Sequence, residues 1–154
     1  MLIFLIGFMG AGKTTLGSAL AAQLGWHFID LDREIEQKSG STIAELFALK
    51  GEERFRMIEQ EVLYDMVKQI HHLKFIIHNY IIACGGGTPC YEDNLAFMKE
   101  NGFVIYLEVS PEILCERLLR TPAGERPVLT CTLPDIRTLL DQRRPYYEAA
   151  HWRC

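Results

Sequence analysis

The sequence predicts an α/β fold of three layers, in which helices cover both faces of a central parallel sheet. Three observations predict it. An apolar run at residues 2–6 leads into a Gly-rich segment and then a helical pattern at residues 13–24. Apolar runs and helical segments alternate along the rest of the chain, as in strands joined by right-handed crossovers. The 154 residues, 49% hydrophobic and 23% charged, fit one packed domain spanning residues 1–154.

Four short apolar runs predict the strands. The first is apolar without a break, as expected for a parallel strand buried on both faces. The others are bounded by Gly or polar residues, the usual limits of a strand. In chain order these runs are residues 2–6, 26–30, the second half of 75–83, and 102–108. Each has the length of a strand in a compact domain.

Helical patterns fill the intervals between the strands. The first ends at Gly25, a typical helix terminator, and the one after Ser110 begins with an N-cap followed by Pro111. The predicted helical stretches are residues 13–24, 32–70 as several helices broken near Gly40 and Gly51, 92–101, 111 to about 120, and 135–150. Residues 121–134 hold three prolines and a glycine without periodicity. A loop of that length in a compact domain predicts an active-site lid.

Charge and cysteine content exclude several classes of function. The formal charge is −4, so a nucleic-acid binder, which would carry a basic excess, is not expected. No apolar run reaches the length of a membrane span, and the apolar start has no basic residue before it, so neither a membrane protein nor an exported one is expected. Five cysteines without a CxxC pair predict reduced thiols in a cytoplasmic protein.

Residues 7–14, Gly-Phe-Met-Gly-Ala-Gly-Lys-Thr, match the phosphate-binding pattern GxxxxGK[ST] in full. Glycines let backbone N–H groups curl around a phosphate, and the following helix presents its positive N-terminus. Lys13 can reach the β- and γ-phosphates, and the Thr14 hydroxyl can bind Mg²⁺. The strand before this loop and the helix after it are the context that the motif requires. The sequence therefore predicts an ATP site with Mg²⁺, formed by Gly10, Ala11, Gly12, Lys13, Thr14 and Thr15.

This loop alone does not choose between a kinase, a GTPase and a motor ATPase. A chain of 154 residues has little room for switch regions or oligomeric attachments, and it lacks the Asn-Lys-x-Asp motif with which GTPases recognise their base. A small-molecule kinase fits best.

Five further segments, in their order and spacing, resemble the shikimate kinase family over about residues 2–147. They are Asp30-Leu31-Asp32, the run Gly51 to Glu59, Gly85-Gly86-Gly87, Arg126-Pro127-Val128-Leu129, and Arg143-Arg144-Pro145-Tyr146-Tyr147. The resemblance implies a nucleoside-monophosphate-kinase-like sheet with strand order 2-3-1-4-5. It also implies transfer of the ATP γ-phosphate to the 3-hydroxyl of shikimate, in the route to chorismate and the aromatic amino acids.

For catalysis and ATP, the resemblance implies roles for six positions. Asp32 would orient the reacting hydroxyl and accept its proton, and Lys13 and the lid residue Arg126 would stabilise the transferring phosphoryl group. Thr14 and Asp30 would lie in the Mg²⁺ shell, and Arg120 would contact the nucleotide. The alternatives are a helix N-cap for Asp30 and a cation at the helix C-terminus for Arg120.

For the substrate, the resemblance implies a binding segment of helices at about residues 32–60. It also implies contacts from residues later in the chain. Arginine suits a carboxylate because its planar guanidinium can form two parallel hydrogen bonds. Arg56 and Arg143 match the carboxylate-binding pair, although Arg144 is adjacent and a shift of one position is the alternative. The other implied contacts are Asp32, Gly85, Gly86, Gly87, Phe47, Phe55 and Glu59. Core packing remains the alternative for both phenylalanines, and a surface pairing with Arg56 remains the alternative for Glu59.

The resemblance implies a fifth strand and a short helix after the last predicted helix, and this sequence stops at residues 151–154. We therefore expect the last edge strand to be missing, which would leave adenine with fewer contacts. The expected partners are ATP and shikimate, with no nucleic acid or membrane, and the expected state is a monomer. Two alternatives remain open. One is a related kinase for another small hydroxylated acid such as gluconate, and the other is a protein that binds ATP or shikimate without turnover.

Overall fold

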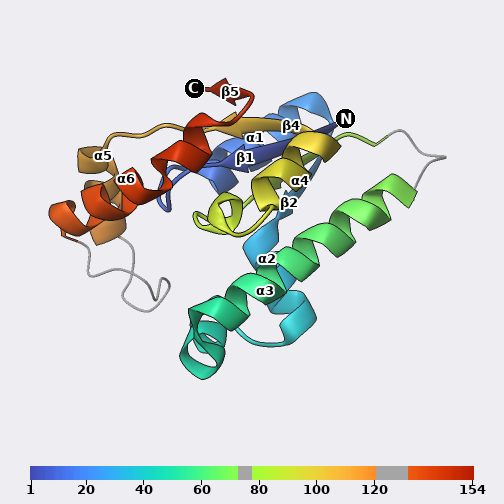
Figure 1. Cartoon of the computed structure of the whole chain (residues 1–154). Coiled ribbons are helices and arrows are strands. Elements are labelled where there is room, and N and C mark those ends of the chain that lie inside the picture. Colours follow the sequence, from blue (N-terminus) through green and yellow to red (C-terminus); the bar gives the residue numbers. More distant parts are fainter. Residues whose placement is uncertain (73–77, 121–131) are drawn as a thin grey trace.

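The computed structural model describes residues 1–72, 78–120 and 132–154. Within them five parallel strands form one sheet in the order β2-β3-β1-β4-β5 (Figure 1). The central strand, β1, is buried along its whole length, which explains why its sequence is apolar without a break. The strands are β1 (Leu2–Ile6), β2 (His27–Asp30), β3 (Tyr80–Ala83), β4 (Phe103–Tyr106) and β5 (Trp152–Arg153). The predicted three-layer α/β fold and its strand order are confirmed.

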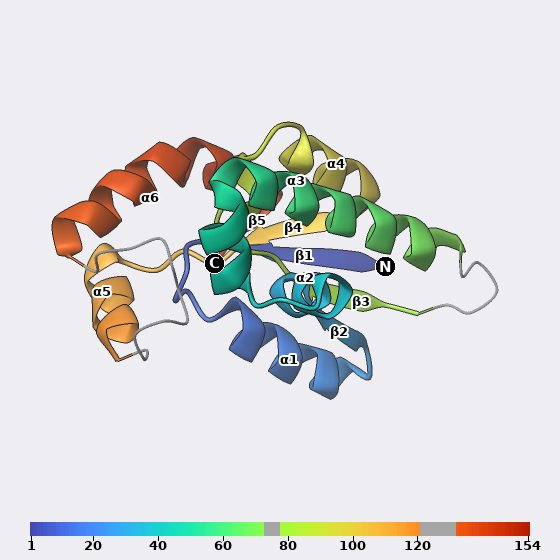
Figure 2. The same ribbon diagram turned by 90° about the horizontal axis from the view of Figure 1, so that it is seen from below.

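Helices cover both faces of this sheet. Figure 2 shows α1 on one side of the strands and α3 with α4 on the other. The helices are α1 (Lys13–Leu24), α2 (Leu31–Ser39), α3 (Ile43–His72), α4 (Asn94–Asn101), α5 (Pro111–Leu119) and α6 (Leu133–Glu148), with a single 3₁₀ turn, η1 (Thr88–Cys90). None of the helices that the structure describes is long and apolar enough to cross a membrane.

Local sequence signals set the helix ends as predicted. Gly25 ends α1 in the left-handed conformation at φ 66°, and the Ser110 hydroxyl accepts the Ile113 N–H at the start of α5. The break expected near Gly51 is a kink within α3, where Gly51 has φ 77°. Helix α6 begins two residues earlier than expected, at Leu133, because proline is tolerated in the first turn of a helix. The rest of the expected lid loop, residues 121–131, lies outside the described residues.

The expectation that the last edge strand is missing is wrong. Trp152 and Arg153 form β5, which pairs in parallel with Ile105 and Tyr106 of β4. The Cys154 N–H donates to the carbonyl oxygen of Tyr106 at 3.0 Å, and the Glu108 N–H donates to the carbonyl oxygen of Cys154 at 2.8 Å. A strand of two residues is too short to show a periodic pattern. Pairing with the edge of β4, rather than the local sequence, therefore determines that β5 forms.

Two apolar clusters hold the layers together. The larger one lies between the sheet and the helices α2 to α6, and the smaller one, which includes Leu5 and Phe28, lies under α1. Cys84 is buried in the larger cluster, and this burial, reinforced by the nearby Glu59 carboxylate, raises the pKa of its thiol. All four cysteines that the structure describes are free, in keeping with the predicted reduced state, and Cys131 falls outside these residues.

Helix α1 approaches the sheet so closely that residue 17 must lack a side chain. A Cβ added at Gly17 would lie 2.7 Å from a ring carbon of Phe28 and 2.9 Å from a methyl carbon of Leu5. We expect Gly17→Ala to lower the free energy of unfolding by about 1–2 kcal/mol, since this overlap outweighs the roughly 1 kcal/mol gain in helix propensity. Urea denaturation measures the change. Ser18→Ala, at the next and exposed position of the same helix, is the control, and an equal or higher stability of Gly17→Ala would contradict the packing described.

Candidate active site

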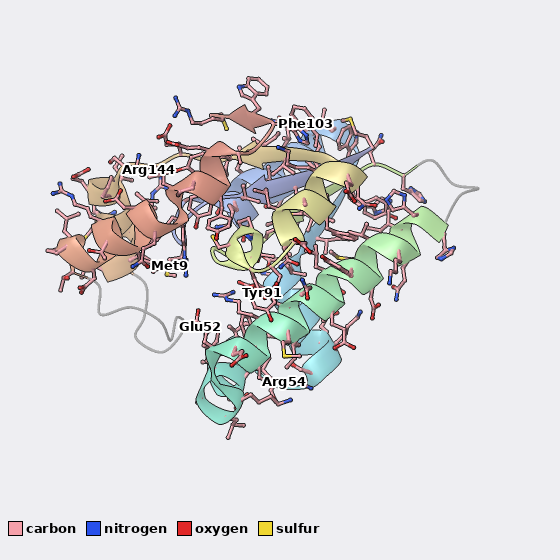
Figure 3. All side chains as sticks on the ribbon, viewed as in Figure 1. Met9, Glu52, Arg54, Tyr91, Phe103 and Arg144 are labelled. Carbon is pink, nitrogen blue, oxygen red and sulfur yellow. The ribbon has the colours of Figure 1, made fainter. Side chains whose placement is uncertain are left out.

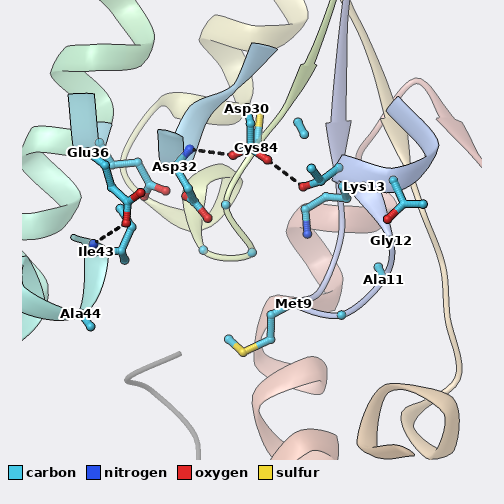
Figure 4. Close-up of a pocket in the computed structure, with 18 of the residues that line it drawn as sticks. Met9, Ala11, Gly12, Lys13, Asp30, Asp32, Glu36, Ile43, Ala44 and Cys84 are labelled. Atoms are coloured by element: carbon cyan, nitrogen blue, oxygen red, sulfur yellow. Dashed lines mark hydrogen bonds between the residues drawn. The ribbon is translucent and has the colours of Figure 1, made fainter. Parts of the chain in front are cut away.

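A cavity of about 1030 Å³ opens at the carboxyl ends of β1, β2 and β3 (Figure 4). Helix α1, which follows β1, and helix α4, which follows β3, lie on opposite faces of the sheet (Figure 2), and such a switch point is where open α/β sheets bind ligands. The three strands deliver the Gly-rich loop, Asp30 with Asp32, and Gly85 to Gly87 to the same cavity. Figure 4 shows Lys13, Asp30 and Asp32 among the residues around it.

The loop after β1 has the shape of a phosphate cradle. Gly10 and Gly12 have φ 82° and 94°, conformations that side chains disfavour. The buried Lys13 Nζ donates to the carbonyl oxygens of Gly7 and Phe8, at 2.8 and 2.9 Å. Lys13 therefore holds the loop closed from within while bringing a positive charge to the cavity. The predicted positions Gly10 to Thr15 all line the cavity.

Thr14 and Asp30 meet beside this cradle. The Thr14 hydroxyl donates to Oδ2 of Asp30 at 2.7 Å, and Oδ1 of Asp30 accepts the Asp32 N–H at 3.1 Å. Asp30 is thus the N-cap of α2, as one interpretation of the sequence held, and it keeps its other oxygen at the cavity. Within the described residues no three or more His, Cys, Asp or Glu side chains form a metal cluster. A hydroxyl and one carboxylate nevertheless suit Mg²⁺, which usually completes its shell with water and phosphate oxygens.

Glu59 is fully buried and holds Arg56 in an ion pair. One carboxylate oxygen of Glu59 lies 2.6 Å from Nη1 of Arg56, and the other accepts the Thr88 hydroxyl at 2.6 Å. Burial alone would lower the pKa of the Arg56 guanidinium, but Glu59 and the more exposed Glu52 outweigh this effect and raise it. The alternative considered for Glu59 is thus half right: the residue does pair with Arg56, but it does not lie on the surface, because α3 turns it inward.

The rings of Phe47 and Phe55 lie beside Arg56. Their centroids are 4.3 Å apart, and the Arg56 guanidinium carbon is 5.8 Å from the Phe47 centroid and 5.2 Å from the Phe55 centroid. Phe55 is buried in the core, and both rings line the cavity. Core packing and a place in the cavity wall are therefore compatible. Cation–π contacts of this kind restrict the guanidinium further.

Two of the three consecutive glycines are required by Arg56 and Glu59. A Cβ added at Gly85 would lie 2.5 Å from a Glu59 carboxylate oxygen and 3.3 Å from Oδ1 of Asp32, and one added at Gly87 would overlap the Arg56 guanidinium. The backbone therefore passes directly over the charged groups. This close approach is the physical reason for the glycines at these two positions.

Arg143 reaches the cavity from α6. It is buried, its guanidinium carbon lies 5.7 Å from the Phe8 ring centroid, and its Nη1 has no hydrogen-bond partner among the residues that the structure describes. A buried donor without a partner carries a desolvation cost that an anionic ligand would remove. The adjacent Arg144 is more exposed, pairs with Asp141 at 3.0 Å and does not line this cavity. The structure therefore brings Arg143, and not Arg144, to the site.

Arg120 lies away from the cavity, and Arg117 lies in it. Arg120 ends α5, its side chain is 78% exposed, and it pairs with Glu116. One turn earlier, Nη1 of Arg117 donates to the carbonyl oxygens of Gly10 and Ala11, at 3.0 and 3.3 Å. The sequence analysis missed Arg117, which lines the cavity, although its three-residue spacing from Arg120 on one helix was a usable signal. Arg126 lies outside the described residues.

The sequence analysis also missed Thr88 and Tyr147 as parts of the site. Thr88 is fully buried, and its carbonyl oxygen accepts a hydrogen bond from the buried Asn94 amide at 2.9 Å. Tyr147 donates its hydroxyl hydrogen to the carbonyl oxygen of Gly86. No motif marks Thr88, whereas Tyr147 belongs to a segment that the resemblance included.

Known proteins that resemble this chain carry the name shikimate kinase. The family model described as shikimate kinase matches residues 9–154. A shikimate kinase from Bacteroides thetaiotaomicron is 40% identical over 155 residues, which cover 97% of this chain and 83% of that protein. One from Bacillus anthracis is 40% identical over 150 residues, covering 97% of this chain and 84% of that protein.

Solved structures agree with these sequence relatives. The crystal structure of the Bacteroides thetaiotaomicron shikimate kinase has a TM-score of 0.86 and 39% identity, over 99% of this chain and 85% of that one. The Acinetobacter baumannii enzyme, solved in complex with shikimate, has a TM-score of 0.87 and 37% identity, over 99% of this chain and 82% of that one. A gluconokinase from Sinorhizobium meliloti, at 18% identity and a TM-score of 0.56, shares the fold.

The Glu59–Arg56 pair can be tested through stability. We expect Glu59→Gln to lower the free energy of unfolding by about 1–3 kcal/mol, because a neutral amide leaves the partly buried guanidinium without its nearest opposite charge. Glu52→Gln is the matched control on the same helix. Glu52 lies 3.5 Å from Arg56 and its side chain is 58% exposed, so its loss should cost less than about 0.5 kcal/mol. Urea denaturation measures both changes. Equal losses in the free energy of unfolding would contradict the conclusion that Glu59 is the main partner of Arg56.

Arg117 and Arg120 can be compared through nucleotide affinity. We expect Arg117→Ala to raise the Kd for ATP roughly tenfold, because the guanidinium anchors the phosphate loop and lines the cavity, and we expect Arg120→Ala to change it less than about twofold. Isothermal titration calorimetry measures both constants. A larger loss in Arg120→Ala than in Arg117→Ala would show that Arg120 is the nucleotide contact.

Proposed function

The chain belongs to the shikimate kinase family, and we propose that its cavity transfers the γ-phosphoryl group of ATP to the 3-hydroxyl of shikimate. The protein is accordingly an ATP-using small-molecule kinase. The observation that carries the assignment of residues is the convergence of three groups on one cavity: the phosphate loop, Asp32, and the two guanidinium groups of Arg56 and Arg143.

Arg56 and Arg143 bind the carboxylate of shikimate. Both are largely withdrawn from solvent, so their attraction for an anion is screened less than at an open surface. Glu59 and the two phenylalanine rings fix the orientation of Arg56, while Arg143 offers the buried donor Nη1, which has no hydrogen-bond partner within the described part of the chain. The Gly86 backbone between them completes the contact with a substrate hydroxyl.

Asp32 orients the 3-hydroxyl of shikimate and accepts its proton as the phosphoryl group is transferred. It stands in the first turn of α2, lines the cavity, and has its carboxylate beside Gly85 of the substrate side. Phosphoryl transfer depends mainly on positioning and charge stabilisation, and Asp32 supplies positioning at the nucleophile. Lys13 and the N–H groups of its loop stabilise negative charge on the phosphate oxygens.

Mg²⁺ is proposed as the metal, held by Thr14 and Asp30. Their oxygens are 2.7 Å apart at the edge of the phosphate loop, and hard oxygen ligands suit this ion. When bound, the ion neutralises charge on the β- and γ-phosphate oxygens. The Asp30 carboxylate also caps α2, so the same side chain links the metal position to the helix that carries Asp32.

The remaining assignments concern the surroundings of the site. We propose that residues 32–60 form the substrate-binding part of a single domain, that the segment between α5 and α6 acts as a lid, and that Arg126 on it closes over the phosphates. The helices α2 and α3, which carry Asp32 and Arg56, support the first of these assignments. We further propose that the enzyme works as a monomer in the cytoplasm, in keeping with its charge and its free thiols.

The proposed reaction and the role of Asp32 are tested together. A coupled assay for ADP release with shikimate, gluconate and other small hydroxylated acids should show stimulation by shikimate, and Asp32→Asn should lower kcat by roughly 100-fold or more, because the amide accepts no proton. Asp65→Asn, at an exposed position of α3, is the matched control.

Each alternative has its own signature in this experiment. A faster rate with gluconate would favour the related kinase, and binding of shikimate by calorimetry without any phosphorylated product would identify a protein that binds without turnover. A near-normal kcat for Asp32→Asn would overturn the role of Asp32 while leaving the reaction intact.

A further inference from the structure

Tyr147 of α6 is a fully buried residue whose hydroxyl reaches Gly86, a residue that lines the cavity. The hydroxyl group donates a hydrogen bond to the carbonyl oxygen of Gly86, with the two oxygens 2.5 Å apart. Tyr147 stands four positions after Arg143, so the two side chains lie on the same face of α6. One helix therefore presents both an arginine and a tyrosine to the same glycine.

Gly86 lies where the phosphate side and the carboxylate side of the cavity meet. A Cβ added to it would be 3.1 Å from the backbone nitrogen of Met9 and 3.4 Å from Nη1 of Arg143. Met9 belongs to the phosphate loop, so the Gly86 backbone fits between that loop and the guanidinium. A small displacement of Gly86 would change the spacing between these two parts of the site.

The aromatic ring of Tyr147 is fixed independently of its hydroxyl. It stacks on Tyr106 of β4, with ring centroids 5.1 Å apart and an angle of 24° between the planes. Burial raises the pKa of the Tyr147 hydroxyl, although the positive charge of Arg143 acts in the opposite direction, so the group stays protonated and able to donate. A phenylalanine would fill the same space, and the hydroxyl is thus the part that packing alone does not require.

We propose that Tyr147 is a positioning residue for phosphoryl transfer, which holds the Gly86 backbone and thereby sets the distance between Arg143 and the phosphate loop. This inference rests on the proposed function, because it concerns how shikimate is placed relative to ATP. Without the hydroxyl, the Gly86 carbonyl loses its tether to α6. The carboxylate site and the phosphate loop then keep their own residues but lose their fixed separation.

The test uses Tyr147→Phe, with Tyr106→Phe as the matched control in the same ring pair. Tyr106 lines a second, smaller hollow beside Glu108 and Arg144 and does not line the main cavity, so it offers the same loss of a hydroxyl away from the glycine loop. We expect Tyr147→Phe to raise the KM for shikimate roughly five- to twentyfold, the effect of one lost hydrogen bond. The Kd for ATP without shikimate should change less than about twofold, and Tyr106→Phe should change neither constant by more than about twofold.

A double variant separates positioning from general loosening of the fold. If Tyr147 acts through the spacing of Arg143, the effects of Tyr147→Phe and Arg143→Lys on the KM for shikimate should be clearly non-additive. ATP binding by calorimetry gives the folded fraction of each variant, to which the kinetic constants are normalised, so a poorly folding variant still yields a result.

Three outcomes overturn the proposal: an unchanged KM for shikimate in Tyr147→Phe, equal changes in the shikimate and ATP constants, or strict additivity with Arg143→Lys. Each can occur while the wild-type enzyme remains stimulated by shikimate, which preserves the proposed function. A wild-type enzyme without that stimulation would instead reject the proposed function itself.

Discussion

The buried carboxylate of Glu59 is the group on which the substrate side of this molecule depends. It is fully enclosed, and a charge in that position is tolerated only because Arg56 and Thr88 meet its two oxygens at 2.6 Å each. The pair then dictates its surroundings: the glycine backbone must pass over it without a side chain, and the phenylalanines close around the guanidinium. Burying the Glu59 carboxylate costs free energy, but its hydrogen bonds to Arg56 and Thr88 hold the Arg56 guanidinium in a fixed position in the cavity.

The parallel sheet explains why the Arg56–Glu59 pair lies beside a phosphate site. Strands β1, β2 and β3 end at the same edge, so the loops that follow them must converge. β1 leads into the phosphate loop, β2 into the carboxylates of α2, and β3 into the glycines over the Arg56–Glu59 pair. Helix α6 adds Arg143 to the cavity, and its Tyr147 contacts Gly86. A protein with a net negative charge thereby brings several positive groups to one small cavity that can bind anions.

The sequence predicted most of the fold because its strands, loops and helix ends leave strong local signals, whereas Asp32, Arg56 and Arg143, which line the cavity, were named only through the family resemblance. The apolar run of β1, the full phosphate-binding pattern and the N-cap before Pro111 are each readable within a few residues. The two-residue strand β5 was missed because its pairing with β4 is a non-local property. The choice between Arg117 and Arg120 likewise depends on which side of α5 faces the loop, and the burial of Thr88 depends on Glu59, which lies 29 residues earlier in the chain.

The central claim is that Arg56 and Arg143, held in place by buried partners, recognise the carboxylate of the substrate. Calorimetric titration of the wild-type protein with shikimate and with its neutral methyl ester tests that claim directly. The ester keeps the ring and the hydroxyls and removes the negative charge, so we expect its Kd to be about 100-fold higher, on the order of 2.7 kcal/mol. Equal affinities for the acid and the ester would contradict the account, because both guanidinium groups would then serve some other purpose.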